Sequence, residues 1–169
     1  MSSIDEEIKS GAITAFIDEY NKSSLAYKPA LIANDHRTGT KILSSIEEEL
    51  KACEEFAFSV AFITMGGIEP LLQVLQELEI KGIPGKILTT DYNTFTEPKA
   101  LEKLESFKNI ELRIYKTDEN AGFHTKGYIF KKNDIYTCIL GSSNMTGKAL
   151  AVNKEWNTRF VSRRINTVT

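Results

Sequence analysis

Residues 123–157 read FHTKGYIFKKNDIYTCILGSSNMTGKALAVNKEWN. Two short apolar, β-type runs flank the polar residues 131–134, a pattern that predicts a β-hairpin with a slightly long turn. In a hairpin, the second strand ends level with the start of the first. We therefore expect the residues next to His124 and those next to Gly141 to meet at one end of a sheet.

This end of the hairpin carries an imidazole, an ammonium group and a carboxamide. His124 and Lys126 are two residues apart, so their side chains share one face of a strand, with Thr125 on the other. Asn144 follows the second strand, and Glu155 comes shortly afterwards. Together they offer a nucleophile, a cation for phosphate oxygens, a neutral donor and a carboxylate that orients the imidazole. The segment therefore predicts a site for phosphate esters.

Four residues form the expected catalytic set: His124, Lys126, Asn144 and Glu155. Four others form the expected substrate-binding set: Thr125, Gly141, Ser142 and Ser143. Taken singly, each has a plainer interpretation, because Gly-Ser-Ser-Asn is ordinary turn chemistry and a lone histidine is usually a solvated side chain. A site is favoured because all the required chemical roles fall within one short segment.

The same segment resembles the half-site motif of the phospholipase D superfamily. That motif is His-x-Lys, then Gly-Ser-x-Asn, then a downstream Glu or Gln. The matching positions here are His124, Lys126, Gly141, Ser142, Asn144 and Glu155. From about Tyr27 onward, and most clearly in KGYIF, ILGSSN and NKEWN, the chain is also similar to two nuclease-like groups. These are the N-terminal domain of bacterial DEAD/DEAH-box helicases and the restriction endonucleases that cut without metal.

One position departs from the longer family signature. The family has an aspartate five residues after the motif lysine, and this chain has Lys131 there, with Asp134 nearby. That aspartate is regarded as structural, and nuclease-like branches often lack it. Its absence argues against a lipid-cleaving member more than against catalysis.

The resemblance implies a two-step reaction without metal or other cofactor. A histidine attacks phosphorus and forms a phosphohistidine, a second histidine protonates the leaving oxygen, and water releases the product. The chain has one such motif, and no matching lysine accompanies its other histidine, His36, which is either a substrate contact or a solvated loop residue. A complete site then requires a second copy, so we expect a homodimer whose two motifs share one cleft.

Three functions compete on this reasoning. The first is a metal-independent nuclease acting on DNA, either free-standing or as the endonuclease part of a helicase or restriction protein. The second is a non-catalytic module that binds DNA or dimerises a DEAD/DEAH-box helicase. The third is a phospholipase. No ATP-binding motif is present, so a covalently linked helicase domain would belong to a longer polypeptide, of which this chain would be a fragment.

Composition limits the partners. A length of 169 residues suits one domain, and 41% hydrophobic with 26% charged residues is ordinary for a globular protein. The net charge of -2 excludes a strongly basic nucleic-acid-coating protein, so contact with nucleic acid must be local. Cys53 and Cys138 are expected to be buried thiols in a reducing compartment. No signal sequence or membrane-length apolar run is present, which predicts a cytoplasmic protein without membrane contact.

Strand-like and helix-like segments alternate along the chain. The pattern predicts an α/β fold, a phospholipase D-like half-domain with a mixed β-sheet sandwiched between helices. We expect one domain over 1–169, with 1–26 as an N-terminal helical extension. The nearly continuous apolar run over 56–64 predicts a strand covered on both faces.

Overall fold

The computed structural model describes residues 2–16, 24–35, 37–91, 95–117 and 122–163. Its seven strands form one sheet in the order β1-β7-β6-β5-β2-β3-β4. Their bounds are β1 Ala30–Ala33, β2 Glu55–Val60, β3 Gly85–Thr90, β4 Ile110–Tyr115, β5 Lys126–Lys132, β6 Ile135–Gly141 and β7 Trp156–Ser162. The β2–β3 and β3–β4 pairs are parallel and the other pairs antiparallel. The expected α/β class with a mixed sheet is confirmed.

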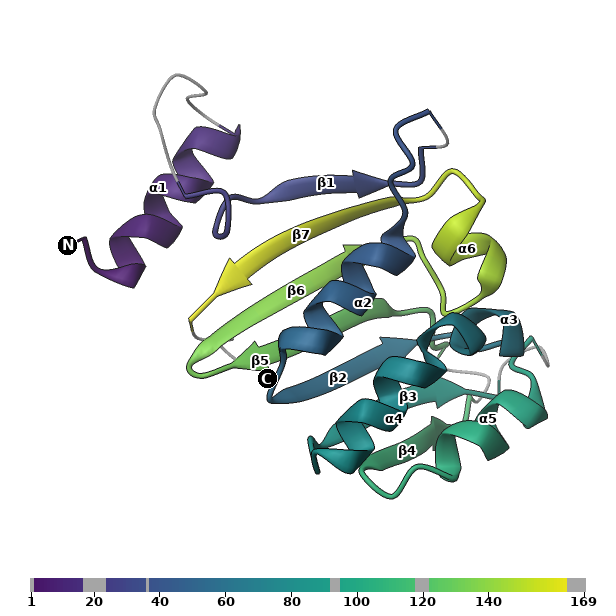
Figure 1. The fold of residues 1–169 in the computed structure, drawn as a ribbon. Coiled ribbons are helices and arrows are strands. Elements are labelled where there is room, and N and C mark those ends of the chain that lie inside the picture. The colour runs from purple at the N-terminus through teal and green to yellow at the C-terminus, as the bar shows by residue number, and fades with distance from the viewer. Residues whose placement is uncertain (1, 17–23, 36, 92–94, 118–121, 164–169) are drawn as a thin grey trace.

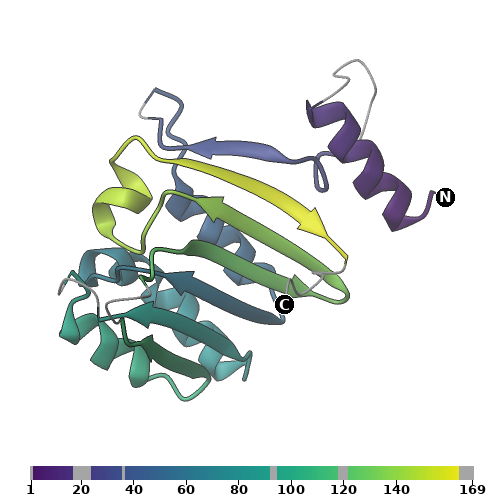
Figure 2. The same ribbon diagram turned by 180° about the vertical axis from the view of Figure 1, so that it is seen from behind.

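Besides the sheet, the described residues form helices, and all but the first gather on one side of the sheet. They are α1 Ile4–Phe16, α2 Ile42–Ala52, α3 Met65–Ile68, the 3-10 turn η1 Glu69–Leu71, α4 Leu72–Ile80, α5 Pro98–Glu105 and α6 Gly147–Ala151. Figure 1 shows α2, α4 and α5 in front of the sheet, and the view from behind shows the opposite face without a helix over it (Figure 2). Helix α1 lies apart from the others, next to the start of β1 (Figure 1). In the described part of the chain, helices therefore cover one face of the sheet, whereas the sequence predicted helices on both.

The strand predicted over 56–64 is shorter than expected and fully buried on one side only. β2 ends at Val60, and its buried side chains alternate with half-buried ones such as Ser59 on the open face. After Val60 the chain leaves the strand but stays inside the protein, where Ile63 is fully buried. A long apolar run looks the same whether a strand continues or gives way to a buried turn.

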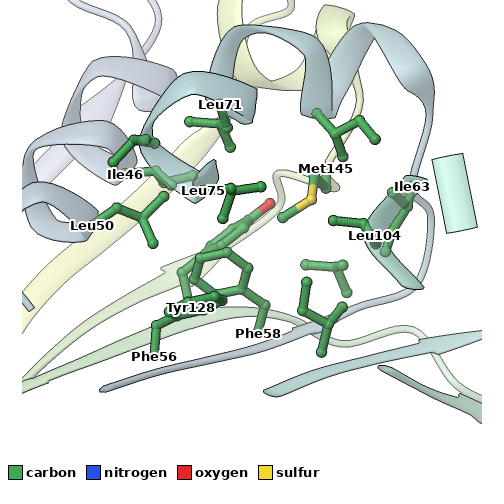
Figure 3. Packing of buried hydrophobic residues seen from close by; sticks show 14 of the residues in the cluster. Ile46, Leu50, Phe56, Phe58, Ile63, Leu71, Leu75, Leu104, Tyr128 and Met145 are labelled. Carbon is green, nitrogen blue, oxygen red and sulfur yellow. The ribbon is translucent and has the colours of Figure 1, made fainter. Parts of the chain in front are cut away.

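The core lies between the helices and the covered face of the sheet (Figure 3). Phe58 of β2 is central, and its ring meets Tyr128 of β5 edge-on at 5.1 Å between centroids. Aliphatic side chains from the helices close over these rings, including Ile46, Leu75 and Leu104. Burial of this apolar surface stabilises the sheet whose end carries the predicted site.

Both cysteines are free and buried, as the sequence predicts. Burial raises the pKa of each thiol, Cys53 and Cys138, to about 11. They remain protonated at neutral pH and act as small apolar groups.

Candidate active site

Three segments of the predicted site meet at one edge of the sheet. β5 begins at Lys126, β6 ends at Gly141 and β7 begins at Trp156. The register pairs Gly127 with Leu140, and the last residue of β6 with the second residue of β7. The hairpin prediction is confirmed, and the residues that flank these strands are brought together.

Lys126 places a cation at this edge. It lies opposite Val60 in the β5–β2 pair, and its Nζ donates a hydrogen bond to the carbonyl oxygen of His124 at 2.9 Å. Burial lowers the pKa of Lys126, and the nearby Glu155 carboxylate opposes this shift. The ammonium is thus partly stripped of water but not tied to a described carboxylate by an ion pair, an arrangement suited to an incoming anion.

Ser142 fixes the Glu155 carboxylate. Its hydroxyl donates to Glu155 Oε2 and accepts from the backbone N–H of Trp156 at 3.1 Å. Its own backbone N–H donates to the Trp156 carbonyl at 3.0 Å, so the turn after β6 is attached to the start of β7. Between described residues of one chain, no hydrogen bond joins Glu155 to the His124 imidazole. Inside the chain, the partner of this carboxylate is a serine.

Asn144 is oriented by a segment that sequence reasoning did not connect with the site. Its Oδ1 accepts the backbone N–H of Phe62 at 3.1 Å, and the Phe62 carbonyl accepts the N–H of Met145 at 3.0 Å. With the amide oxygen occupied, the Nδ2 hydrogens are the donors left for a phosphate oxygen. The backbone of Phe62, two residues after β2, therefore holds the end of the Gly-Ser-Ser-Asn turn in place.

Ser143 differs from its expected role in substrate binding. The residue is fully buried, and its hydroxyl accepts from Asn157 Nδ2 at 2.9 Å. Its carbonyl accepts from the Tyr128 hydroxyl at 3.0 Å. Burial raises the pKa of Tyr128, which keeps that hydroxyl protonated as a donor. Ser143 supports the turn from the core side, because no part of it is open to a substrate.

Gly141 and Thr125 hold the backbone at the site. A Cβ on Gly141 would overlap the Trp156 carbonyl and the Asn157 side chain, so only glycine lets β6 and β7 approach this closely. Thr125 is exposed, and its hydroxyl lies 2.7 Å from the hydroxyl of Ser59 on β2. The segment that carries His124 is thereby fastened to the neighbouring strand.

The histidine itself is exposed and borders an aromatic side chain. The rings of His124 and Phe62 meet edge-on, with centroids 5.9 Å apart. Phe62 also contacts Phe95, which precedes α5. The sequence did not predict either phenylalanine at the site. Phe62 falls in the apolar run that predicts a buried strand.

The departure from the family signature lies away from this edge. Lys131 pairs with Glu55 at 3.6 Å, near the opposite end of β5 from Lys126. Asp134 in the hairpin turn accepts a hydrogen bond from Arg163 at 2.6 Å, and this contact lowers its pKa. His36 lies outside the described residues. In the described ranges, no group of three or more His, Cys, Asp or Glu side chains is arranged to hold a metal ion.

Comparisons place these observations among known proteins. Residues 46–168 match the family described as "Cardiolipin synthase, PLD-like domain". No curated protein sequence matches the chain. In the part of the chain that the structure describes, no helix has the length and apolar character needed to cross a membrane.

Solved structures share the fold at low sequence identity. NucT from Helicobacter pylori superposes with a TM-score of 0.62 at 17% identity, covering 78% of this chain and 84% of that one. Nuc from Salmonella typhimurium, a phospholipase D family member, gives 0.55 at 19% identity, covering 78% and 82%. Yeast tyrosyl-DNA phosphodiesterase gives 0.52 at 13% identity, covering 78% of this chain but 31% of that enzyme. At these identities the likeness establishes the fold.

Proposed function

The chain belongs to the phospholipase D superfamily, a group of phosphodiester-cleaving enzymes, through its PLD-like domain, and from this premise we propose that it is a metal-independent nuclease acting on DNA. The observation that supports the proposal is that His124 and Asn144 both contact Phe62, while Lys126 begins the neighbouring strand β5. That edge offers an exposed imidazole, a partly buried ammonium and an oriented amide.

In the proposed reaction the His124 imidazole attacks phosphorus. A P–N bond forms and the P–O bond to the leaving strand breaks, while a second histidine gives that oxygen its proton. Water then attacks the phosphohistidine, loses a proton to the second histidine and frees His124. Lys126 and the Asn144 amide hold the non-bridging oxygens, whose charge grows in the transition state.

The second histidine is proposed to come from a second subunit. The chain covers 84% of NucT but 31% of the yeast enzyme, so its fold corresponds to about a third of that longer protein. Of the two histidines in the sequence, only His124 stands in a His-x-Lys motif, and a two-fold axis beside it would supply the same groups twice. We place this axis at the sheet edge that carries His124 and Lys126.

The pairing of Glu155 supports the same arrangement. Its carboxylate is held by Ser142, and within the described chain it makes no hydrogen bond to His124. In the dimer, His124 of the partner subunit is the proposed imidazole that it orients. Attachment to a helicase or restriction protein remains a prediction of the sequence resemblance.

Cleavage in a metal chelator tests the catalytic proposal. We expect the purified chain to cut single- or double-stranded DNA at an undiminished rate in EDTA, because the charge stabilisation comes from Lys126 and neutral donors. The measurement is the initial rate of product formation on labelled DNA, with and without EDTA. Phosphatidylcholine vesicles serve as the comparison substrate.

Each other outcome of that assay points to a different function. DNA binding without cleavage would replace the nuclease by a recognition module. Hydrolysis of the phospholipid but not of DNA would replace it by a phospholipase. Cleavage lost in EDTA would contradict the metal-independent mechanism.

Subunit mixing tests the shared site. When wild-type chains are mixed and exchanged with His124→Ala chains, only dimers with two wild-type subunits should be active. The activity of the mixture should then be proportional to the square of the wild-type fraction. For independent monomers, the activity would be directly proportional to the wild-type fraction. Light scattering on the same samples gives the oligomeric state, and a monomer that cleaves would refute the dimer.

A further inference from the structure

An aromatic pair, Phe62 and Phe95, lies beside the histidine. The Phe62 ring stands edge-on to the His124 imidazole at 71°, and its centroid is 5.0 Å from that of Phe95 at an interplanar angle of 55°. Phe95 is 59% exposed, which is a large fraction for an aromatic side chain. A single exposed phenylalanine is common, but this one is two ring contacts from the proposed nucleophile.

Both rings are mounted on a fixed backbone. Phe62 is held at its N–H by Asn144 and at its carbonyl by Met145. The residues after Phe95 are tied to the same segment, because Thr96 Oγ1 donates to the Ala61 carbonyl at 3.3 Å. Glu97 continues this connection, its N–H donating to the Ile63 carbonyl at 2.9 Å. The aromatic pair is therefore pre-positioned relative to the site, which lowers the entropic cost of binding a flat ligand.

A second pair of rings near the histidine serves as an internal comparison. Tyr115 and Phe123 are nearly parallel, at 26° and 5.4 Å, and Phe123 is 9% exposed. The two stacked rings cover one face of each other, and Tyr115, at 38%, is less exposed than Phe95. Phe95 instead lies tilted against Phe62 and leaves most of its surface open to a ligand.

We propose that Phe95, supported by Phe62, is a stacking platform for an unpaired nucleobase next to the scissile phosphate. The inference rests on the proposed function and adds a substrate class to it, namely single-stranded nucleic acid or a frayed end. With the phosphate at His124 and Lys126, an adjacent base lies within reach of the neighbouring rings. In a duplex the bases stack on one another, so only unpaired ones can present a face to Phe95.

Measuring the binding of two different strands separates the contribution of the bases from that of the phosphates. One is a single-stranded oligodeoxynucleotide, and the other is a strand of equal length made of abasic tetrahydrofuran units. All variants carry His124→Ala, so neither strand is cut. Phe95→Ala should weaken binding of the base-bearing strand about 5- to 100-fold, the range of base–aromatic stacking, and leave the abasic strand unchanged. Phe95→Trp should retain binding, as should Ile80→Ala, which truncates an exposed apolar side chain at the end of α4.

Three results would overturn the platform. They are an equal loss on both strands, no loss on either, or dissociation of the dimer by Phe95→Ala in light scattering, which would assign Phe95 to the subunit interface. The binding readout does not depend on catalysis. If the wild-type chain binds the base-bearing strand through Phe95 but does not cut it, the platform stands and the nuclease proposal fails.

Discussion

Replacing His124 with alanine is expected to lower DNA cleavage in EDTA by about 10⁴-fold or more, the scale seen when a covalent nucleophile is removed. Neither serine of the adjoining turn can replace the imidazole, because the Ser142 hydroxyl is engaged by Glu155 and Ser143 is buried. Under the two-histidine mechanism the substitution also removes the general acid, since the same residue serves from each subunit. Single-turnover rates on labelled single-stranded DNA measure the effect.

A chemical trap makes the His124 test specific. Phosphohistidine is a covalent enzyme–DNA adduct, so wild-type protein denatured in mid-reaction should carry the label on the peptide that contains His124. The alanine variant should carry none, while keeping the wild-type thermal transition. A residual rate above about a tenth of wild type, on the scale of such losses, would assign the attack to another group.

Removing the Lys126 ammonium is expected to be the second largest loss. Lys126→Ala should lower kcat about 10²- to 10³-fold, the effect of deleting one group that stabilises transition-state charge. Lys132→Ala is the matched control, because this exposed lysine ends the same strand, far from the site. It should leave the rate unchanged. A similar loss in both variants would mean that general basic charge, and not the position of Lys126, governs the rate.

The pKa of Lys126 also determines how cleavage activity is expected to change at alkaline pH. Burial lowers the pKa of Lys126 from its ordinary 10.5. The cation is present below this lowered pKa and disappears as pH rises through it, so activity should decline at a lower pH than an exposed lysine would allow. Lys126→Arg keeps its charge at high pH and should move that decline upward. An identical alkaline limb in the arginine variant would assign the decline to another group.

Several features of this protein follow from local sequence patterns. The hairpin after His124 is predicted by two alternating apolar runs around a polar turn, and strand pairing brings their outer ends together. The buried state of Cys138 follows from the largely apolar run 135–140 that contains it. The spacing His-x-Lys places two side chains on one face of a strand. Each of these depends on period-two alternation or on turn chemistry, and neither needs knowledge of distant contacts.

Other features depend on residues brought together from far along the chain. Ser143 looks like an exposed turn residue, but Tyr128 and Asn157 bury it. Phe62 looks like part of a strand, but its backbone orients Asn144 across 82 positions of sequence, and its ring borders His124. The uncovered face of the sheet could not be predicted from the sequence either, because an apolar run does not show which face of a strand a helix will cover. Sequence alone predicted the chemical groups of the candidate site and the strand ends beside them. The tertiary structure decided which of these groups face the solvent and which support them from the core, because that choice depends on long-range packing.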